Sequence, residues 1–204
     1  SCFVFNRWTS DGQLDTSFGT EGTLAIDTSN YIELDGIATA GDDGFYFASY
    51  QDDGVSAGTY ITHVTAGGAV DSSFGDGGST YLDNLYATAG GANLVLRSDG
   101  HLLQSTTGYN EDAGVIEGQV TEIDASGGVV QQVTIPTGSG DCADIALGID
   151  GAGGVVLLNY LYNDADGSLP PGTLQLTRFN ADLTVDSSFG SDGRLVITTI
   201  SGAI

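Results

Sequence analysis

The sequence predicts an all-β fold, a propeller-like array of three four-stranded units preceded by an N-terminal half unit. Three observations predict it. A motif starts at Trp8, Val64, Ile123 and Phe179, a nearly constant period of 56, 59 and 56 residues. Short apolar runs recur between turns, and 32 glycines against 3 prolines fit many short strands joined by glycine turns. No stretch keeps a 3.6-residue apolar period, so we expect no helix.

The motif has the core Asp-x-Ser-Phe-Gly-x-x-Gly, and each of its residue types has a physical role. Asp and Ser side chains hydrogen-bond nearby backbone amides and so stabilise a turn. We expect the Phe to anchor the turn against the neighbouring unit. The glycines allow positive φ where the chain bends into the next strand. The core is intact at residues 15–22, 71–78 and 186–193, whereas the copy at 123–137 keeps only an apolar residue at the Phe position.

Residues 11–22 read Asp-Gly-Gln-Leu-Asp-Thr-Ser-Phe-Gly-Thr-Glu-Gly, and this segment resembles the signature of the bacterial delta-sixty repeat proteins. The resemblance covers most of the chain and is weak in the third copy. It implies a fold similar to β-propellers and a secreted or cell-surface location. It attaches no general enzymatic role to the repeat and assigns no catalytic residues.

The chain divides into a half unit and three full units that form a single repeat domain of 204 residues. The half unit, 1–30, has two predicted strands, 2–8 and 23–27. Unit 1, 31–85, has predicted strands at 34–40, 45–50, 59–65 and 79–82. Unit 2, 86–138, has them at 93–97, 101–106, 119–124 and 132–135. Unit 3, 139–204, has them at 143–149, 155–161, 173–179 and 194–200.

The half unit matches only the second half of a full unit, which raises the question of how the array ends. A propeller usually closes by pairing its first strand with the last blade, and we expect the half unit to take that role. A disulfide between Cys2 and Cys142 would staple the closure, stabilising by roughly 5 kcal/mol in the chain-entropy model. The alternative for these cysteines is two unrelated buried thiols.

Two other arrangements of the array stay open. The chain is a fragment of a larger propeller, or a neighbouring subunit completes the half unit through its exposed strand edge. Strand addition of that kind would give dimers or filaments.

The chain is strongly acidic, with 27 Asp and Glu against 4 Lys and Arg and a net charge of −23. Such a surface repels nucleic acid and anionic lipid. It indicates either a solvated acidic shell or sites for divalent cations. The sequence shows neither a signal peptide nor a run of 18 apolar residues, so we expect a processed product or a fragment that does not span a membrane. With the resemblance, this predicts an extracellular or cell-surface location.

The loop after the second strand of each unit is the most suggestive place for a ligand. Each loop combines a tyrosine with acidic residues and a glycine. The candidate ligand-binding residues are Tyr50, Tyr109 and Tyr162, and the candidate metal ligands are Asp52, Asp53, Glu111, Asp112, Asp164 and Asp166. Carboxylates this close can bind Ca²⁺, and tyrosines beside acids can hold a sugar ring. The third interpretation is that these are simple hairpin loops, polar because they are exposed.

Catalytic residues have little support in the sequence. We expect His63 to be structural and His101 to face solvent. No nucleophile–base pair can be assembled, although abundant carboxylates leave a glycosidase or lyase open. The leading hypothesis is a non-enzymatic secreted surface, adhesion or assembly module, possible partners being another copy, a glycan or a surface protein. The alternative is a carbohydrate-binding protein or carbohydrate-active enzyme that uses the Tyr and Asp loops.

Overall fold

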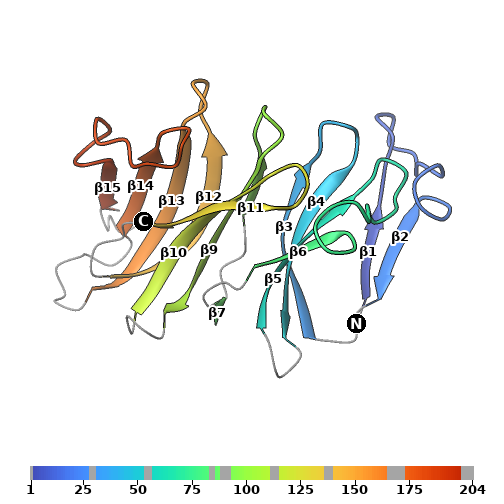
Figure 1. Ribbon diagram of the computed structural model, residues 1–204, viewed down its shortest axis with the longest axis horizontal. Helices are drawn as coiled ribbons and strands as arrows, with labels where there is room; N and C mark the ends of the chain where they lie inside the picture. Colours follow the sequence, from blue (N-terminus) through green and yellow to red (C-terminus); the bar gives the residue numbers. More distant parts are fainter. Residues whose placement is uncertain are drawn as a thin grey trace, which may run out of the picture.

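The computed structural model describes residues 2–27, 31–52, 57–82, 86–87, 93–110, 115–135, 140–164 and 173–198. All the regular structure in these residues is β-strand, which confirms the predicted all-β class. The strands form four antiparallel sheets that lie side by side along the long axis (Figure 1). Within the described ranges, no helix is present that could cross a membrane.

The half unit is a two-stranded sheet at the N-terminal end of the row. It consists of β1 (Cys2–Asn6) and β2 (Thr23–Asp27), paired so that Phe3 lies opposite Ile26 and Phe5 opposite Leu24. These four apolar side chains lie on one face, because alternate residues of a strand point to the same side of a sheet.

Unit 1 is a four-stranded meander in the order β3-β4-β5-β6. Its strands are β3 (Tyr31–Thr39), β4 (Phe45–Asp52), β5 (Ala57–Val64) and β6 (Ser79–Leu82). The four strands predicted for this unit are all present. The turn between β3 and β4 is closed by a hydrogen bond from the Ala40 amide to the Gly44 carbonyl, 2.9 Å long.

Unit 2 has the same plan, with one strand split. Its strands are β7 (Tyr86–Ala87), β8 (Asn93–Leu96), β9 (Leu102–Asn110), β10 (Val115–Ile123) and β11 (Val129–Ile135). Both β7 and β8 pair with β9, in place of a single first strand. Because the motif has decayed here, β11 starts directly after the Asp124–Gly128 turn and is longer than β6.

Unit 3 ends the row with the order β12-β13-β14-β15. Its strands are β12 (Gly140–Ile149), β13 (Val155–Asp164), β14 (Thr173–Phe179) and β15 (Arg194–Thr198). The predicted strands are again present. In β14 every second residue is buried, from Thr173 to Phe179, so one side of this sheet packs on a neighbour and the other does not.

Neighbouring units stack face to face in one repeated direction. We call the side of each sheet that points toward the following unit its forward face, and the opposite side its rear face. Each junction buries the forward face of one unit on the rear face of the next. In β4, for example, Phe45 and Phe47 pack on the half unit, while Tyr46 and Ala48 pack on unit 2.

The three junctions each hold one apolar core. The first, between the half unit and unit 1, contains Phe3, Phe5, Phe18, Leu24, Ile26, Phe45, Phe47 and Val64. The second, between units 1 and 2, contains Tyr46, Ala48, Ile61, Phe74, Leu82, Leu94, Leu96, Leu102 and Ile123. The third, between units 2 and 3, contains Val95, Leu103, Val120, Val133, Ile135, Leu147, Val155, Leu157, Phe179 and Leu183. The hydrophobic core is therefore divided between the junctions and does not lie within any one sheet.

Two predictions about the ends of the array are wrong in this structure. Among the described residues the half unit does not pair with the last unit: β1 pairs with β2 alone, and the two ends of the row lie far apart in Figure 1. The reason is that Phe3 and Phe5 are buried against unit 1, which makes the half unit one more layer of the row. The predicted disulfide is not formed either, because Cys2 is a free and exposed thiol and β12, which carries Cys142, lies in another sheet.

Candidate functional site

The predicted tyrosine and acidic loops lie largely outside the residues that the structure describes. Asp53, Glu111, Asp112 and Asp166 fall in undescribed segments, and only strand positions are defined for Asp52, Tyr109, Tyr162 and Asp164. β4, β9 and β13 do end at the same edge of the row, the lower edge in Figure 1. No group of three or more metal-ligating side chains occurs in the described part of the chain. Calcium and sugar binding at these loops therefore stay predictions.

The three tyrosines do not occupy equivalent positions in their strands. Tyr50 is half-buried and lies five residues after the start of β4. Tyr109 and Tyr162 lie seven residues after the starts of β9 and β13. Sequence inspection aligned them because each precedes an acidic loop, but the strand register places Tyr50 one pleat earlier.

The motif turns gather at the opposite edge, where each motif Asp is fully engaged. One carboxylate oxygen of Asp71 accepts hydrogen bonds from the Ser73 amide at 3.0 Å and the Ser73 hydroxyl at 2.6 Å. The same pair of bonds forms at Asp15 and Asp186. These serine hydrogen bonds are the main reason why the pKa of each of the three carboxyls is lowered. The motif aspartates therefore stabilise turns and are not free metal ligands.

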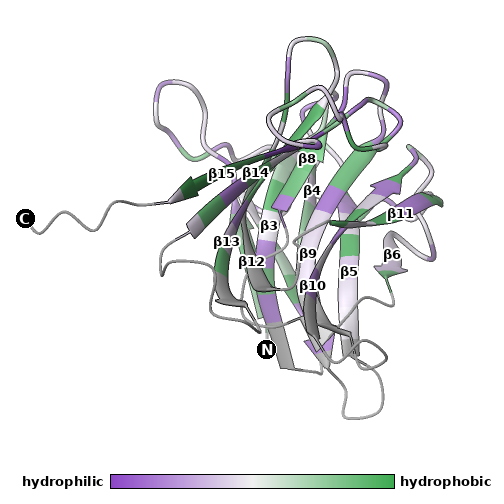
Figure 2. Cartoon of the chain, turned by 90° about the vertical axis from the view of Figure 1, so that its left-hand side faces the viewer, coloured by the Kyte–Doolittle hydropathy of each residue, from purple (hydrophilic) through white to green (hydrophobic). Residues whose placement is uncertain are grey.

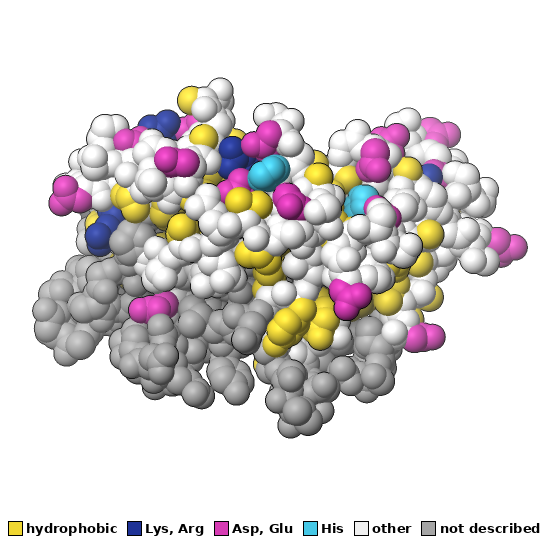
Figure 3. Space-filling model, in the orientation of Figure 1, with side chains coloured by type: hydrophobic (Ala, Val, Ile, Leu, Met, Phe, Trp, Pro, Cys, Tyr) yellow, Lys and Arg dark blue, Asp and Glu magenta, His cyan; other side chains and the backbone are white. Residues whose placement is uncertain are grey.

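The second oxygen of each motif Asp meets an Arg or His side chain from the residue just before the motif. The partners are Arg7 for Asp15, His63 for Asp71 and Arg178 for Asp186. In unit 2 the equivalent position holds Glu122, which pairs with His101 at 2.8 Å and Arg97 at 3.3 Å. Figure 3 shows the two histidines, together with Arg side chains, among carboxylates in the upper part of the molecule. Each motif Asp at this edge thus has an Arg or His partner, and in unit 2 an acidic residue takes the basic position.

Both histidines are parts of this framework. His63 is buried, bonds Asp71 through Nδ1 at 2.9 Å, and stacks on the Tyr46 ring with centroids 4.4 Å apart. This confirms its predicted structural role. The prediction that His101 faces solvent is confirmed in part, because 33% of its side chain is exposed while its ring is held by Glu122.

The motif also makes the contact between units. The Gly19 amide donates to the Gly67 carbonyl of unit 1 at 2.9 Å, and the Gly75 amide donates to the Ser126 carbonyl of unit 2 at 2.8 Å. The preceding Phe18 and Phe74 are each 2% exposed. This confirms the role predicted for the motif Phe as an anchor against the neighbouring unit.

The receiving turn must present a glycine at these two junctions. Gly68 and Gly127 have φ of +75° and +88°, and a Cβ on either would collide with the backbone of the docking glycine, Gly19 or Gly75. The same turn position in unit 3 is Leu183, with φ of 61°, and its side chain is 2% exposed in the third core. A leucine fits there because unit 2 has lost the motif loop that would otherwise occupy the space.

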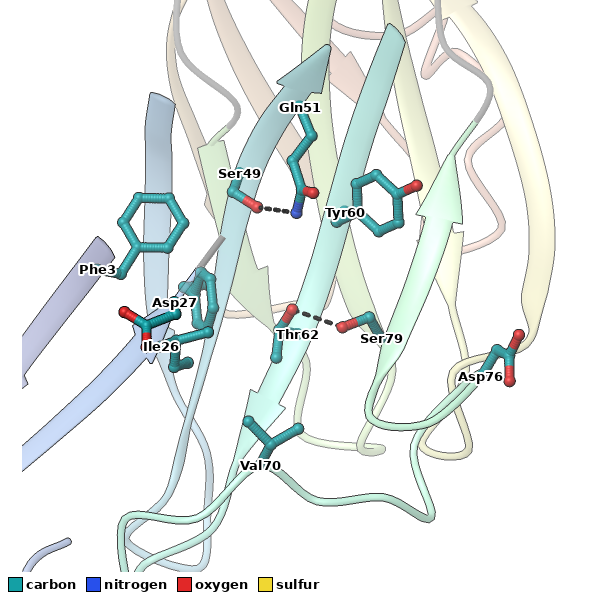
Figure 4. Close-up of a pocket in the computed structure, with 11 residues that line it drawn as sticks. Phe3, Ile26, Asp27, Ser49, Gln51, Tyr60, Thr62, Val70, Asp76 and Ser79 are labelled. Atoms are coloured by element: carbon teal, nitrogen blue, oxygen red, sulfur yellow. Dashed lines mark hydrogen bonds between the residues drawn. The ribbon is translucent and has the colours of Figure 1, made fainter. Parts of the chain in front are cut away.

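A cleft of about 450 Å³ opens between the half unit and unit 1 (Figure 4). Phe3 and Ile26 line it from the half unit, and Ser49, Gln51, Tyr60 and Thr62 line it from the rear face of unit 1. The Gln51 amide donates to the Ser49 hydroxyl at 3.3 Å, and the Thr62 and Ser79 hydroxyls share a hydrogen bond of 2.7 Å. Among the described residues, β1 has no strand on the side where, in unit 1, β4 flanks β5.

The forward face of unit 3 is an apolar surface that no described residue covers. Val156, Leu158, Leu174 and Leu176 lie on it by strand register, and the exposed residues Leu195 and Ile197 extend it across β15. Figure 2 looks onto this end of the molecule, where β14 and β15 carry hydrophobic stretches. Sequence reasoning missed this face, although the motif spacing could have identified it by aligning β15 with β6.

Comparison of the sequence with known protein families finds no match, and neither does comparison with curated proteins.

Proposed function

We propose that this chain is a non-enzymatic assembly module of a secreted or cell-surface protein, built of delta-sixty-like repeats in a propeller-like array. The observation that carries the proposal is the repeated junction, which stacks forward face on rear face three times in one direction. An array of this kind has an unsatisfied face at each end, and unsatisfied apolar faces are association sites.

The propeller-like interpretation is supported by the plan of the units. Units 1 and 3 are four-stranded antiparallel meanders, and unit 2 has the same plan with its first strand split. Units 1 and 2 pack on neighbours through both faces, as propeller blades do. The half unit supplies the equivalents of the third and fourth strands of a blade. β1 therefore presents a free strand edge, and a strand added there would complete the blade and fill the cleft of Figure 4.

Calcium and an extracellular location remain parts of the proposal. They are supported by the acidic composition, the resemblance of the motif and the acidic loops that follow β4, β9 and β13. If Ca²⁺ binds these loops, adding EDTA lowers Tm and restoring Ca²⁺ recovers it. An unchanged Tm under EDTA would remove calcium from the proposal.

The assembly function is tested by measuring mass and shape in solution across a range of protein concentrations. Light scattering gives the mass, and negative-stain images give the shape, each with and without Ca²⁺. We expect species larger than one chain that grow with concentration. Because the net charge of −23 opposes association, salt should strengthen it. A monodisperse monomer at every concentration and salt would contradict the proposal.

Carbohydrate binding is the second candidate, and the cleft of Figure 4 favours it. The cleft combines the Tyr60 ring with hydroxyl, amide and carboxylate groups, a combination that can hold a sugar ring. A glycan array screens for ligands, and Tyr60→Ala should abolish any hit. Tyr81→Ala is the matched control, because Tyr81 packs on Tyr60 but does not line the cleft. An array without hits would exclude this candidate.

A further inference from the structure

The end faces of the row can be compared with the buried faces, position by position. The last strands of units 1, 2 and 3 can be aligned by their pairing with the strand before. In each unit one residue pairs with the residue five positions before the end of that preceding strand. These equivalent pairs are Leu82 with Thr59, Ile135 with Gly118, and Ile197 with Leu174. Leu82 is 1% exposed and Ile135 is 2% exposed, but Ile197 is 40% exposed. The forward face of unit 3 thus has the same apolar design as two faces that the next unit covers.

The rear face of the half unit shows the complementary pattern. Trp8 is equivalent to Val64, Ile123 and Phe179, the residues with which the other copies of the motif begin. Those three are 0%, 0% and 1% exposed, each buried on the preceding unit, but Trp8 is 63% exposed. Val4, on the same face of β1 as Asn6, is also exposed.

The turns at the two ends of the row also correspond to the two turns that meet at an inner junction. Phe189 and Gly190 in unit 3 keep the intact motif, yet Phe189 is only half-buried and the Gly190 amide makes no bond to another turn within the described residues. In the half unit, Gly12 is equivalent to Gly68 and Gly127, with φ of +80°. A Cβ on Gly12 would meet nothing within 4 Å, so the space that a docking glycine fills at the two inner junctions is open.

From these matches we infer that the forward face of unit 3 binds the rear face of the half unit of a second copy of this chain. The inference rests on the proposed assembly function and specifies its contact. Ile197 and Phe189 of one copy pack on Trp8 of the next, and the Gly190 amide donates to the Asp11 carbonyl, as Gly19 does to Gly67. A second copy is the expected partner because the chain forms the same kind of interface between its own units.

The contact joins two different faces, so it is heterologous. Heterologous contacts give an open filament or, if the rotation closes, a ring of copies. This differs from strand addition at β1, because the partner covers a sheet face and leaves the strand edge free. The two modes therefore predict different sensitive residues.

Trp8 provides a direct probe because it is the only tryptophan in the chain. If association buries it, the emission of the wild-type protein shifts to shorter wavelength as concentration rises. Quenching by acrylamide should fall over the same range in which light scattering records a rise in mass. Mass that rises without any change at Trp8 would overturn the inference while leaving the assembly function standing.

Two variants of β15 test the other side of the contact. Ile197→Asp places a charge on the forward face and should raise the dissociation constant roughly ten-fold or more. Val196→Asp is the matched control: Val196 is the adjacent residue, 48% exposed, and it lies on the opposite face beside Gln175. We expect the control to stay within about two-fold of wild type. Equal effects from both variants, or none from Ile197→Asp, would overturn the inference.

Gly12→Leu tests the docking turn without relying on the apolar face. Leu183 adopts the equivalent left-handed conformation, so the turn tolerates leucine, and a thermal melt confirms that the variant folds. The new side chain fills the space for Gly190 and should weaken association roughly ten-fold. A folded Gly12→Leu variant that associates like wild type would contradict the inference. A wild-type protein that is always monomeric would contradict both the inference and the assembly function.

Discussion

The junctions within this chain are of two kinds, and they differ in which chemical groups join the units. At the first two, a motif glycine amide donates to a carbonyl of the next unit, and a motif Phe fills the core beneath it. At the third the motif is lost. There the Arg97 guanidinium donates to the Ala181 carbonyl at 2.8 Å, and the Gln131 amide donates to the Asp182 carbonyl at 3.2 Å. Leu183 fills the core from the opposite side.

The difference shows that the stacking of units matters more than the motif that usually achieves it. A glycine contact needs a glycine in both turns, whereas side-chain contacts from Arg97 and Gln131 leave room for a leucine. The two solutions exclude each other, because the motif loop and the Leu183 side chain would occupy the same space. The absence of the motif loop in unit 2 therefore leaves the space that Leu183 of unit 3 fills.

The largest effect is expected from removing the anchor of an intact junction. Phe74→Ala empties the core between units 1 and 2 and should lower the free energy of unfolding by about 3–5 kcal/mol. Denaturant unfolding monitored by circular dichroism measures it. Phe189→Ala is the control in the uncovered copy of the motif, and its cost should be about 1 kcal/mol because Phe189 is half-buried. Equal costs would mean that the motif Phe stabilises its own turn and not the junction.

Truncating the substitute anchor at the third junction should cost nearly as much. Leu183→Ala removes a side chain that is 2% exposed and should lower the free energy of unfolding by about 2–4 kcal/mol. The equivalent Gly68 and Gly127 show that the backbone does not need a leucine for its turn. A neutral Leu183→Ala variant in denaturant unfolding would contradict the role of Leu183 as an anchor of the third junction.

Exchanging the turn residue between junction types should give an intermediate effect. Gly127→Leu puts a side chain against the Gly75 backbone and should cost about 1–3 kcal/mol. Gly12→Leu, where nothing lies within 4 Å, carries only the cost of positive φ and should fall near 1 kcal/mol. Parallel thermal melts compare the two. A Gly127→Leu variant as stable as Gly12→Leu would show that the second junction can adopt the side-chain solution.

The strands could be predicted from the sequence because their signals are local. Alternating polarity and turn residues recur at fixed spacing, so the four strands of each full unit were placed within a few residues. The stacking partners could not be predicted in this way. Phe3 and Phe5 indicate a buried face on the first strand. Nothing in that segment shows whether unit 1 or the last unit covers this face. The sequence therefore predicts that the half unit closes a ring with the last unit, whereas in the structure it packs on unit 1 as a further layer.

The candidate sites were harder to predict, for a related reason. The tyrosine loops are visible in the sequence as clusters of Tyr and acidic residues. The cleft of Figure 4 is lined by residues of two units that are far apart in the sequence. The open ends were readable in principle, since Trp8 and Val64 begin equivalent copies of the motif. The role of Leu183 could not be predicted, because a leucine in place of the turn glycine resembles a degenerate copy of the turn. Its role becomes clear only when the absence of the motif loop in unit 2 is considered together with it.

The smallest effect concerns the first strands of units 1 and 3, which share a bulge. Asp35 occupies it in β3, and Ile145 occupies the equivalent position in β12. Burial, followed by repulsion from Glu33, raises the pKa of Asp35 to about 6 from 3.8. An acid whose pKa is raised by folding favours the folded state when protonated. Its contribution is therefore complete below pH 3.8 and is lost as pH rises through about 6.

Asp35→Asn should remove this pH-dependent loss and bring unit 1 closer to unit 3, which has an uncharged residue in the bulge. Because Asp35 is partly exposed, we expect a gain of only about 1 kcal/mol at pH 7, or roughly 2–4 °C in Tm. At pH 4 the two proteins should melt within about 1 °C of each other, because Asp35 is then protonated when folded. Both proteins retain the motif aspartates, whose contribution to stability falls in acid. Comparing the two proteins at each pH therefore removes that contribution from the difference in Tm. A gain of equal size at pH 4 would mean that Asn improves the bulge itself and that ionisation of Asp35 has no part in it.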